Sequence, residues 1–229
     1  MKIGILCAGD REVAPFLPML ANAKTSEKSM LTIYEGKLAG TDVAVLYSGV
    51  CKVNAAIAAQ ELIGEYGCEA IINAGTAGAM DEALAVFDTV VGTEYAYHDV
   101  AAHILTEFHP WLEAPLFAAD KALLEVARCA ADGAERIHFG RMVTGEQFIT
   151  DEGRESINAR FHPLCVDMES AAVAHVCHVN RVPFLAVRTM TDTPSHAGVG
   201  AFEENCAKAS SVAADFVCNM LQILRRDDL

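Results

Sequence analysis

The sequence predicts an α/β fold, a single domain over residues 1–229 in which helices sandwich a mixed, largely parallel, twisted central sheet as three α/β/α layers. Short apolar runs rich in β-branched residues alternate along the chain with longer amphipathic segments. Strands that alternate with helices form parallel sheets covered on both faces. The 229 residues, 52% of them apolar and 21% charged, suffice for one large core.

Eight segments are expected to be strands because they are short, apolar and rich in β-branched residues. They are residues 2–7, 31–38, 42–48, 70–75, 87–97, 137–145, 164–168 and 183–190. Four longer segments have helical periodicity and end near glycines or basic residues. These are residues 53–66, 119–132, 168–179 and 202–226.

The charge balance argues against nucleic-acid and membrane partners. The chain has 17 basic and 31 acidic residues, and its net charge of −14 repels phosphate backbones and anionic lipids. The apolar run at the N-terminus is too short for a signal peptide, and no stretch reaches the roughly 18 apolar residues of a spanning helix. We therefore expect a cytoplasmic protein.

The eight cysteines predict buried, reduced thiols rather than disulfides or a zinc site. They form no C-x-x-C pair, and several lie within apolar runs. His175, Cys177 and His178 could share part of a helix, but no second group of ligands follows at metal spacing, so helix packing is the preferred interpretation. No metal or other cofactor is expected.

Polar residues that follow the predicted strands are the candidates for a functional site. Ligands of open α/β sheets bind where the carboxyl ends of strands converge. Three of the candidates are acids: Glu12, Glu169 and Asp192. Each also has a structural explanation, in a first helical turn or as a turn or capping residue. Their shared position after strands of one sheet indicates that they meet in one crevice.

Two other motifs are less specific. Residues 73–80, NAGTAGAM, are expected to form a glycine-rich turn that a flat ligand could approach, but they match neither the dinucleotide nor the P-loop pattern. His98, Asp99 and His103 could form a catalytic or metal group, although a structural hydrogen-bonded pair is the simpler interpretation. The G-x-S-x-G motif of a serine nucleophile is absent.

Six motifs combine into a recognisable pattern. They are MKIGIL-x-AG-x-x-E at the start, SG-x-x-KVNAA at 48–56, IINAGTAGAM at 71–80, TGEQFI at 144–149, VDMESAAVAHV at 166–176 and PFLAVRTMTD at 183–192. Together they resemble the 5′-methylthioadenosine/S-adenosylhomocysteine nucleosidases of the nucleoside phosphorylase/hydrolase superfamily. The resemblance covers nearly the whole chain and implies a nucleoside phosphorylase-like fold and a homodimer that uses no cofactor.

The resemblance also implies a reaction: hydrolysis of the N-glycosidic bond of 5′-substituted adenosines, namely methylthioadenosine, S-adenosylhomocysteine and 5′-deoxyadenosine. Glu12 would be the general base that activates water, Asp192 the acid at purine N7, and Glu169 would hold the ribose hydroxyls. Protonation at N7 makes adenine a neutral leaving group, and carboxylates favour positive charge on the ribose. The further substrate-binding residues that it implies are Thr76, Gly78, Phe148, Ile149, Asp167, Met168, Arg188, Thr191 and Phe202.

Phosphorolysis is the first alternative. Phosphorylases of this superfamily place arginines around a phosphate, including one in the strand before the glycine motif, whereas residues 71–74 read IINA. Arg11 is the one cation that could support a phosphate site. A futalosine-type nucleoside hydrolase and a catalytically silent nucleoside-binding protein are the remaining alternatives.

Three departures from the family pattern bear on the substrate. Asp167 stands where bacterial members usually have a glutamate, and Gly9 stands where they have a methionine or similar residue. Residues 100–113, which include Trp111, differ from the aromatic, glycine-containing loop that covers the 5′ substituent and reaches the neighbour's site in family dimers. The sequence therefore leaves the preference among 5′ substituents open.

Overall fold

The computed structural model describes residues 1–150, 153–195 and 198–227 of the chain. Its strands are β1 (Lys2–Cys7), β2 (Ala21–Lys28), β3 (Leu31–Leu38), β4 (Thr41–Tyr47), β5 (Ala70–Ala79), β6 (Thr89–Tyr97), β7 (Phe117–Ala118), β8 (Ile137–Thr144), β9 (Cys165–Asp167) and β10 (Phe184–Asp192). Its helices are α1 (Asp10–Val13), α2 (Lys52–Gly64), α3 (Ala102–Glu107), α4 (Lys121–Ala130), α5 (Arg154–Phe161), α6 (Ser170–Asn180) and α7 (Val199–Asp227), with a short 3-10 turn at Leu17–Met19.

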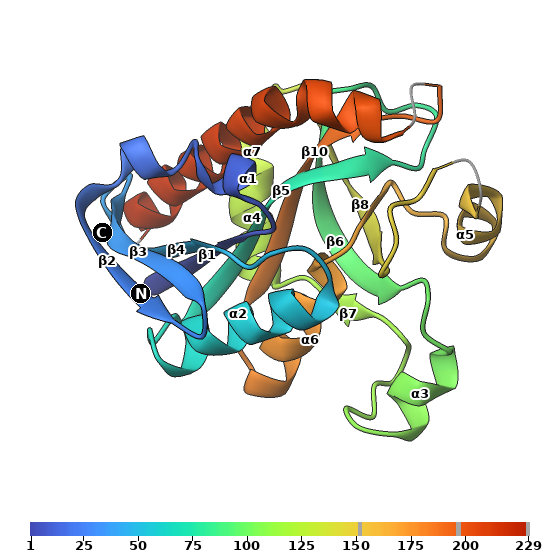
Figure 1. Cartoon of the computed structure of the whole chain (residues 1–229), viewed down its shortest axis with the longest axis horizontal. Helices are drawn as coiled ribbons and strands as arrows, with labels where there is room; N and C mark the ends of the chain where they lie inside the picture. Colours follow the sequence, from blue (N-terminus) through green and yellow to red (C-terminus); the bar gives the residue numbers. More distant parts are fainter. Residues whose placement is uncertain (151–152, 196–197, 228–229) are drawn as a thin grey trace.

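Helices cover both faces of one mixed sheet, which confirms the predicted α/β fold (Figure 1). Helices α1 and α4 pack with the long α7 on one face, while α2 and α6 pack together on the other. Helices α3 and α5 lie at the periphery (Figure 1). The strands between these layers are almost wholly buried near the centre of the sheet, and their apolar side chains form the core.

The sheet closes on itself through half of its strands. Neighbours follow the order β10-β6-β8-β9-β5-β1-β4-β3-β2, β7 pairs with β6, and β10 also pairs with β5. Strands β5, β10, β6, β8 and β9 thus form a ring, from which the remaining strands extend as an open sheet. Five of the pairings are parallel and five are antiparallel, so the sheet is less parallel than predicted.

All eight predicted strands and four predicted helices are present, with ends shifted by a few residues. Strand β2 was not predicted because its sequence, ANAKTSEK, is polar and nearly all exposed, as an edge strand can be. The prediction of a glycine-rich turn at 73–80 was wrong. Strand β5 continues to Ala79, since its last residues pair with β10 on one side and with β9 on the other.

The cysteines are thiols, and most of them are buried, as the sequence predicts. All eight cysteines are free thiols, and five of them are buried: Cys7, Cys68, Cys165, Cys177 and Cys206. Burial raises the pKa of these thiols, most strongly for those at the centre of the sheet. Among the described helices none is both long and apolar enough to cross a membrane.

Candidate active site

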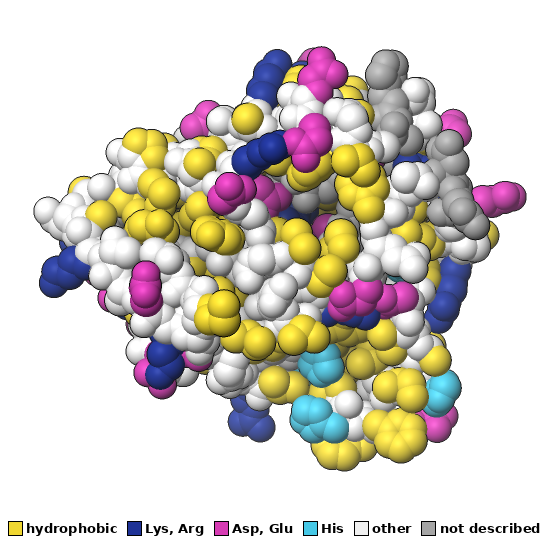
Figure 2. Space-filling view, viewed as in Figure 1, with side chains coloured by type: hydrophobic (Ala, Val, Ile, Leu, Met, Phe, Trp, Pro, Cys, Tyr) yellow, Lys and Arg dark blue, Asp and Glu magenta, His cyan; other side chains and the backbone are white. Residues whose placement is uncertain are grey.

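A cavity of about 380 Å³ opens where the parallel strands β1, β5 and β10 reach their carboxyl ends. Figure 2 shows this face, with charged side chains gathered around a hollow near its centre. Segments far apart in the sequence line it. They are residues 8–12, Val50, 76–78, 147–149, 166–169, 191–192, Phe202, Glu203 and Cys206.

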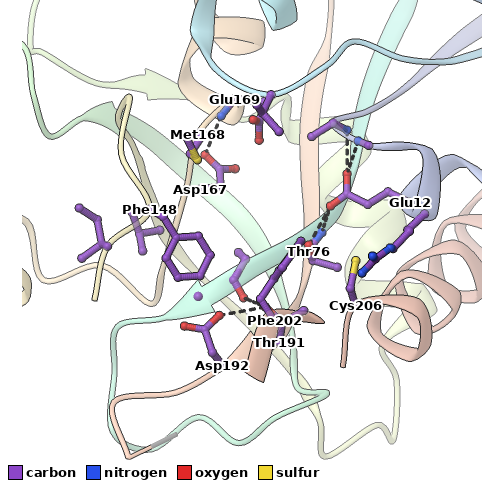
Figure 3. Close-up of a pocket in the computed structure, with 18 of the residues that line it drawn as sticks. Glu12, Thr76, Phe148, Asp167, Met168, Glu169, Thr191, Asp192, Phe202 and Cys206 are labelled. Carbon is purple, nitrogen blue, oxygen red and sulfur yellow. Dashed lines mark hydrogen bonds between the residues drawn. The ribbon is translucent and has the colours of Figure 1, made fainter. Parts of the chain in front are cut away.

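The three predicted acids converge on this cavity. Glu12, Glu169 and Asp192 all line it, and their exposed fractions are 6%, 4% and 1%. Glu12 and Asp192 lie on opposite sides, and Glu169 lies on a third (Figure 3). The other predicted residues that line it are Thr76, Gly78, Phe148, Ile149, Asp167, Met168, Thr191 and Phe202. Arg188 does not line the cavity, because it is fully buried behind the acids.

Glu12 is held by four hydrogen-bond donors. Its Oε2 accepts from the backbone N–H of Ala8 at 2.7 Å and of Gly9 at 3.3 Å. Its Oε1 accepts from the backbone N–H of Thr76 at 2.7 Å and from the Thr76 hydroxyl at 2.8 Å. These donors come from two strand ends, so they fix the carboxylate against β5 in one orientation (Figure 3).

This position of Glu12 requires a glycine opposite it. A Cβ atom on Gly75 would lie 2.5 Å from the Glu12 carboxyl carbon, which is closer than any real contact. Gly75 therefore allows the Glu12 side chain to pack closely against β5, whereas the sequence predicted that this glycine motif forms a turn.

Both carboxylate oxygens of Asp167 accept hydrogen bonds from other groups of the protein. Its Oδ1 accepts from the Thr144 hydroxyl at 2.6 Å and from the backbone N–H of Ser170 at 3.1 Å, and its Oδ2 accepts from the Ser170 hydroxyl and from Arg188 Nε at 2.9 Å. The shorter side chain that distinguishes this chain thus stands at the centre of a hydrogen-bond network. Asp167 borders the cavity, but its oxygens are used to orient Arg188 and the start of α6.

Glu169 has fewer partners and a more perturbed pKa. Its Oε1 accepts from the backbone N–H of Cys51 at 2.9 Å, and its Oε2 accepts from Arg188 Nη2 at 3.3 Å. Burial raises the pKa of Glu169 to about 7, against the opposing effect of Arg188. Cys51, whose backbone N–H donates to Glu169, has a φ of 79°. A positive φ costs energy in a residue other than glycine.

Asp192 has one oxygen free. The Thr191 hydroxyl donates to its Oδ1 at 2.9 Å, whereas Oδ2 is buried without a hydrogen-bond partner among the described residues. Burial raises the pKa of Asp192, although the Thr191 hydroxyl and the charge of Arg154 lower it. Asp192 therefore keeps its proton to a higher pH than an ordinary aspartate and can donate it from Oδ2.

A shift in strand register places this acid in the cavity. Successive residues of a regular strand point to opposite faces, yet Thr191 and Asp192 both line the cavity. The register of β10 against β5 shifts between Met190 and Asp192, where Asp192 pairs with Gly78. Such irregularities re-aim side chains next to functional sites. A Cβ atom on Gly78 would lie 3.1 Å from Asp192 Oδ2, so this glycine keeps the free oxygen accessible.

Aromatic side chains form the apolar wall. The rings of Phe148 and Phe202 lie edge to face, 6.1 Å apart, on the Asp192 side of the cavity, whereas Met168 lies beside Asp167 and Glu169 (Figure 3). The sequence interpretation missed Cys206, whose thiol lines the cavity from α7, and the ion pair between Arg11 and Glu203. Within a long helix no local pattern distinguishes the residues that face a cavity from those that pack on the sheet.

The histidine-containing groups that the sequence offers as other candidate sites lie outside the cavity. His98, Asp99 and His103 do not line the cavity, and Asp99 forms an ion pair with Lys52 at 2.9 Å. His175 stacks on Phe117 with ring centroids 5.0 Å apart, as expected for helix packing. Residues 1–150, 153–195 and 198–227 contain no cluster of three or more histidine, cysteine or acidic side chains suited to a metal ion.

We expect Gly75→Ala to destabilise the protein, because the added Cβ forces Glu12 and β5 apart. Overpacking of this kind costs about 1–3 kcal/mol in the free energy of unfolding, measurable by urea denaturation. Gly9→Ala is the matched control, since a Cβ there would meet no atom within 4 Å. Equal stabilities for the two variants would contradict the tight approach of Glu12 to β5.

The raised pKa of Glu169 predicts a pH-dependent stability. Between pH 4.5 and about 7 the folded state holds more protons on Glu169 than the unfolded state, so the free energy of unfolding falls as pH rises through this window. Glu169→Gln removes this loss, and we expect the variant to gain up to about 3 kcal/mol relative to the unmodified protein between pH 4.5 and 8. Urea unfolding across this range measures it. Glu125→Gln, an exposed change on α4, should leave the two pH curves parallel.

Comparison with known proteins agrees with this geometry. Residues 2–222 match the family model described as the phosphorylase superfamily. The 5′-methylthioadenosine/S-adenosylhomocysteine nucleosidase of Bacillus thuringiensis subsp. konkukian is 33% identical over 231 residues, which cover 98% of this chain and 100% of the relative. The same enzyme of Colwellia psychrerythraea, solved in complex with adenine, is 33% identical with a TM-score of 0.88, over 98% of this chain and 96% of that one.

A more distant structure shares the fold. Futalosine hydrolase of Helicobacter pylori is 24% identical with a TM-score of 0.87, over 100% of this chain and 98% of that one. The family model, the full-length relatives and the sheet with its three converging acids lead to one assignment. The chain belongs to the 5′-methylthioadenosine/S-adenosylhomocysteine nucleosidase family within the phosphorylase superfamily.

Proposed function

We propose that the protein hydrolyses the N-glycosidic bond of 5′-substituted adenosines, methylthioadenosine first, to adenine and the 5′-substituted ribose. The observation that carries this proposal is the contrast between two acids on opposite sides of one cavity. Asp192 has a raised pKa and a free oxygen, whereas donors surround both oxygens of Glu12. Two carboxyl groups with different environments can serve as acid and base in one reaction.

The base of the nucleoside would lie at the Asp192 end. Phe148 and Phe202 offer apolar faces to a planar purine, and the neighbouring backbone of Ile149 and Gly78 borders the same space. In this position Asp192 Oδ2 donates its proton to N7 as the C1′–N9 bond breaks. The electron pair of that bond remains with adenine, which leaves as a neutral molecule.

The ribose would lie between Glu169, Met168 and Glu12. Glu169 accepts hydrogen bonds from the ribose hydroxyls, and its charge favours the positive ribose of the transition state. Glu12 accepts a proton from a water molecule whose oxygen forms the new bond to C1′. The reaction balances with water alone, so we propose no cofactor.

Arg188 would hold Glu169 and Glu12 in position from the buried side of the cavity wall. Its Nη2 donates to Glu169, and its Nη1 lies 3.9 Å from Glu12 Oε1. The sequence resemblance placed Arg188 among the residues that bind substrate, but its complete burial makes it a positioning residue in this proposal.

Phosphorolysis has weaker support in the structure. Arg11 is the single basic side chain among the described residues that line the cavity, and Glu203 neutralises it across 2.5 Å. A phosphate monoanion or dianion needs several donors of positive charge, and here it would also approach Glu12 and Glu169. Water is the nucleophile that fits this acidic environment.

Adenine release should therefore be independent of phosphate. We expect equal initial rates from methylthioadenosine in phosphate-free buffer and in buffer with added phosphate at constant ionic strength, measured by quantifying free adenine. A rate that requires phosphate, with 5-methylthioribose 1-phosphate as the second product, would rule out hydrolysis.

Asp192→Asn should reduce kcat about 10²- to 10⁴-fold, because the amide cannot transfer a proton to N7. Adenine release from methylthioadenosine measures the loss, and thermal melting checks that the variant is folded. Asp132→Asn, on an exposed turn after α4, is the matched control. Near-normal turnover in Asp192→Asn would show that another group protonates the base.

We also propose that the protein is a homodimer. Apolar side chains of α2, α3 and α6 and of the segment after α3 remain exposed on one side of the molecule: Val53, Ile57, Ile104, Phe108, Trp111 and Val179. Figure 2 shows part of this apolar surface beside several histidines. Contact with a second copy would remove these side chains from water.

A further inference from the structure

The mouth of the cavity contains an ion pair that the proposed reaction does not use. Arg11 of α1 and Glu203 of α7 approach to 2.5 Å between Nη1 and Oε2, and their side chains are 48% and 52% exposed. Both line the cavity, together with the exposed Asp10. A basic side chain and two acidic ones thus meet at the entrance of a site whose inner wall is largely apolar.

The pair lies where the 5′ substituent of a bound nucleoside would point. If the base occupies the Asp192 end, against Phe148 and Phe202, and the ribose lies by Glu169, the lining residues that remain include Val50, residues 9–11 and Glu203. This set combines an apolar side chain, Val50, with the charged side chains of Asp10, Arg11 and Glu203. That combination suits a 5′ thioether that carries a charged end group.

Gly9 leaves open space beside the ion pair. A Cβ atom built on it would meet no atom within 4 Å, and the residue has no side chain of its own to fill that space. The substituent of a nucleoside bound at Glu169 can extend through this space toward Arg11.

We propose that Arg11 and Glu203 recognise the amino-acid end of a 5′-homocysteinyl group, which makes them determinants of activity on S-adenosylhomocysteine. The substrate carboxylate would bind the Arg11 guanidinium, and its ammonium would bind Glu203, with Asp10 as a second acceptor. This inference rests on the proposed function, because it assumes a 5′-substituted adenosine in the cavity.

The energetics favour a zwitterion over a single charge. Binding of a zwitterion exchanges one exposed ion pair for two, so no charge is left without a partner. The pair that is given up is worth little, since half-exposed ion pairs contribute only marginally in water. A methylthio group carries no charge and gains nothing from this exchange.

The test compares substrates as well as variants. Arg11→Gln and Glu203→Gln would be assayed for kcat/KM on S-adenosylhomocysteine, on methylthioadenosine, and on analogues that lack either the carboxylate or the ammonium group. We expect Arg11→Gln to lower the ratio of kcat/KM for S-adenosylhomocysteine over methylthioadenosine about three- to tenfold, as loss of a charge-assisted contact at a partly exposed site should. The same ratio for the analogue without a carboxylate should not fall.

Glu203→Gln provides the reciprocal arm. It should lower the ratio for S-adenosylhomocysteine and for the analogue that keeps only the ammonium, but not for the analogue that keeps only the carboxylate. Lys24→Gln, which removes a positive charge from the exposed strand β2, is the control for net charge.

Two results would overturn the inference. Unchanged ratios in both variants would show that the pair does not contact the amino-acid end, while continued adenine release from methylthioadenosine would leave the proposed hydrolysis intact. A loss in Arg11→Gln that is equal for every substrate and appears only with added phosphate would instead assign Arg11 to a phosphate site. Absence of adenine release from any substrate in the unmodified protein would refute the proposed function itself.

Discussion

The site depends on one buried cation. Arg188 is completely enclosed, and its guanidinium joins Asp167, Glu169 and Glu12, which come from β9, the start of α6, and α1. Removing charges from water is costly, and an arginine in this position is tolerable only because carboxylates surround it. The converse also holds, since three acids could not be packed so closely without a positive charge behind them. Each element that bears an acid is thereby tied to the centre of β10.

Much of this arrangement follows from the sequence, for reasons of topology. The central strands are apolar runs because both of their faces are buried. Since ligands of α/β sheets bind at the carboxyl ends of strands, the positions of Glu12, Glu169 and Asp192 after strands suffice to predict that they meet. Features without an apolar pattern could not be found in this way. The exposed β2, the short α5 and the closure of the sheet by β10 and β5 depend on contacts between distant segments.

The roles within the site were less predictable than its members. The acids at 167 and 169 are neighbours in sequence and look alike, yet Asp167 is saturated by donors of the protein whereas Glu169 retains capacity toward the cavity. Arg188 belongs to a conspicuous motif but lies out of reach of a ligand. Such distinctions depend on which donors the folded chain brings to each oxygen, and spacing along the sequence does not encode them.

The shift in register near the end of β10 restricts the sequence changes that this strand tolerates. The acid at 192 is aimed by the hydrogen bonds of the strand before it, so its direction is a property of the backbone. Loss of a single residue anywhere between the start of β10 and the irregularity would turn the carboxyl group toward the opposite side of the sheet while the amino acid itself remained. Point substitution can therefore tune this acid, but only exact strand length preserves it.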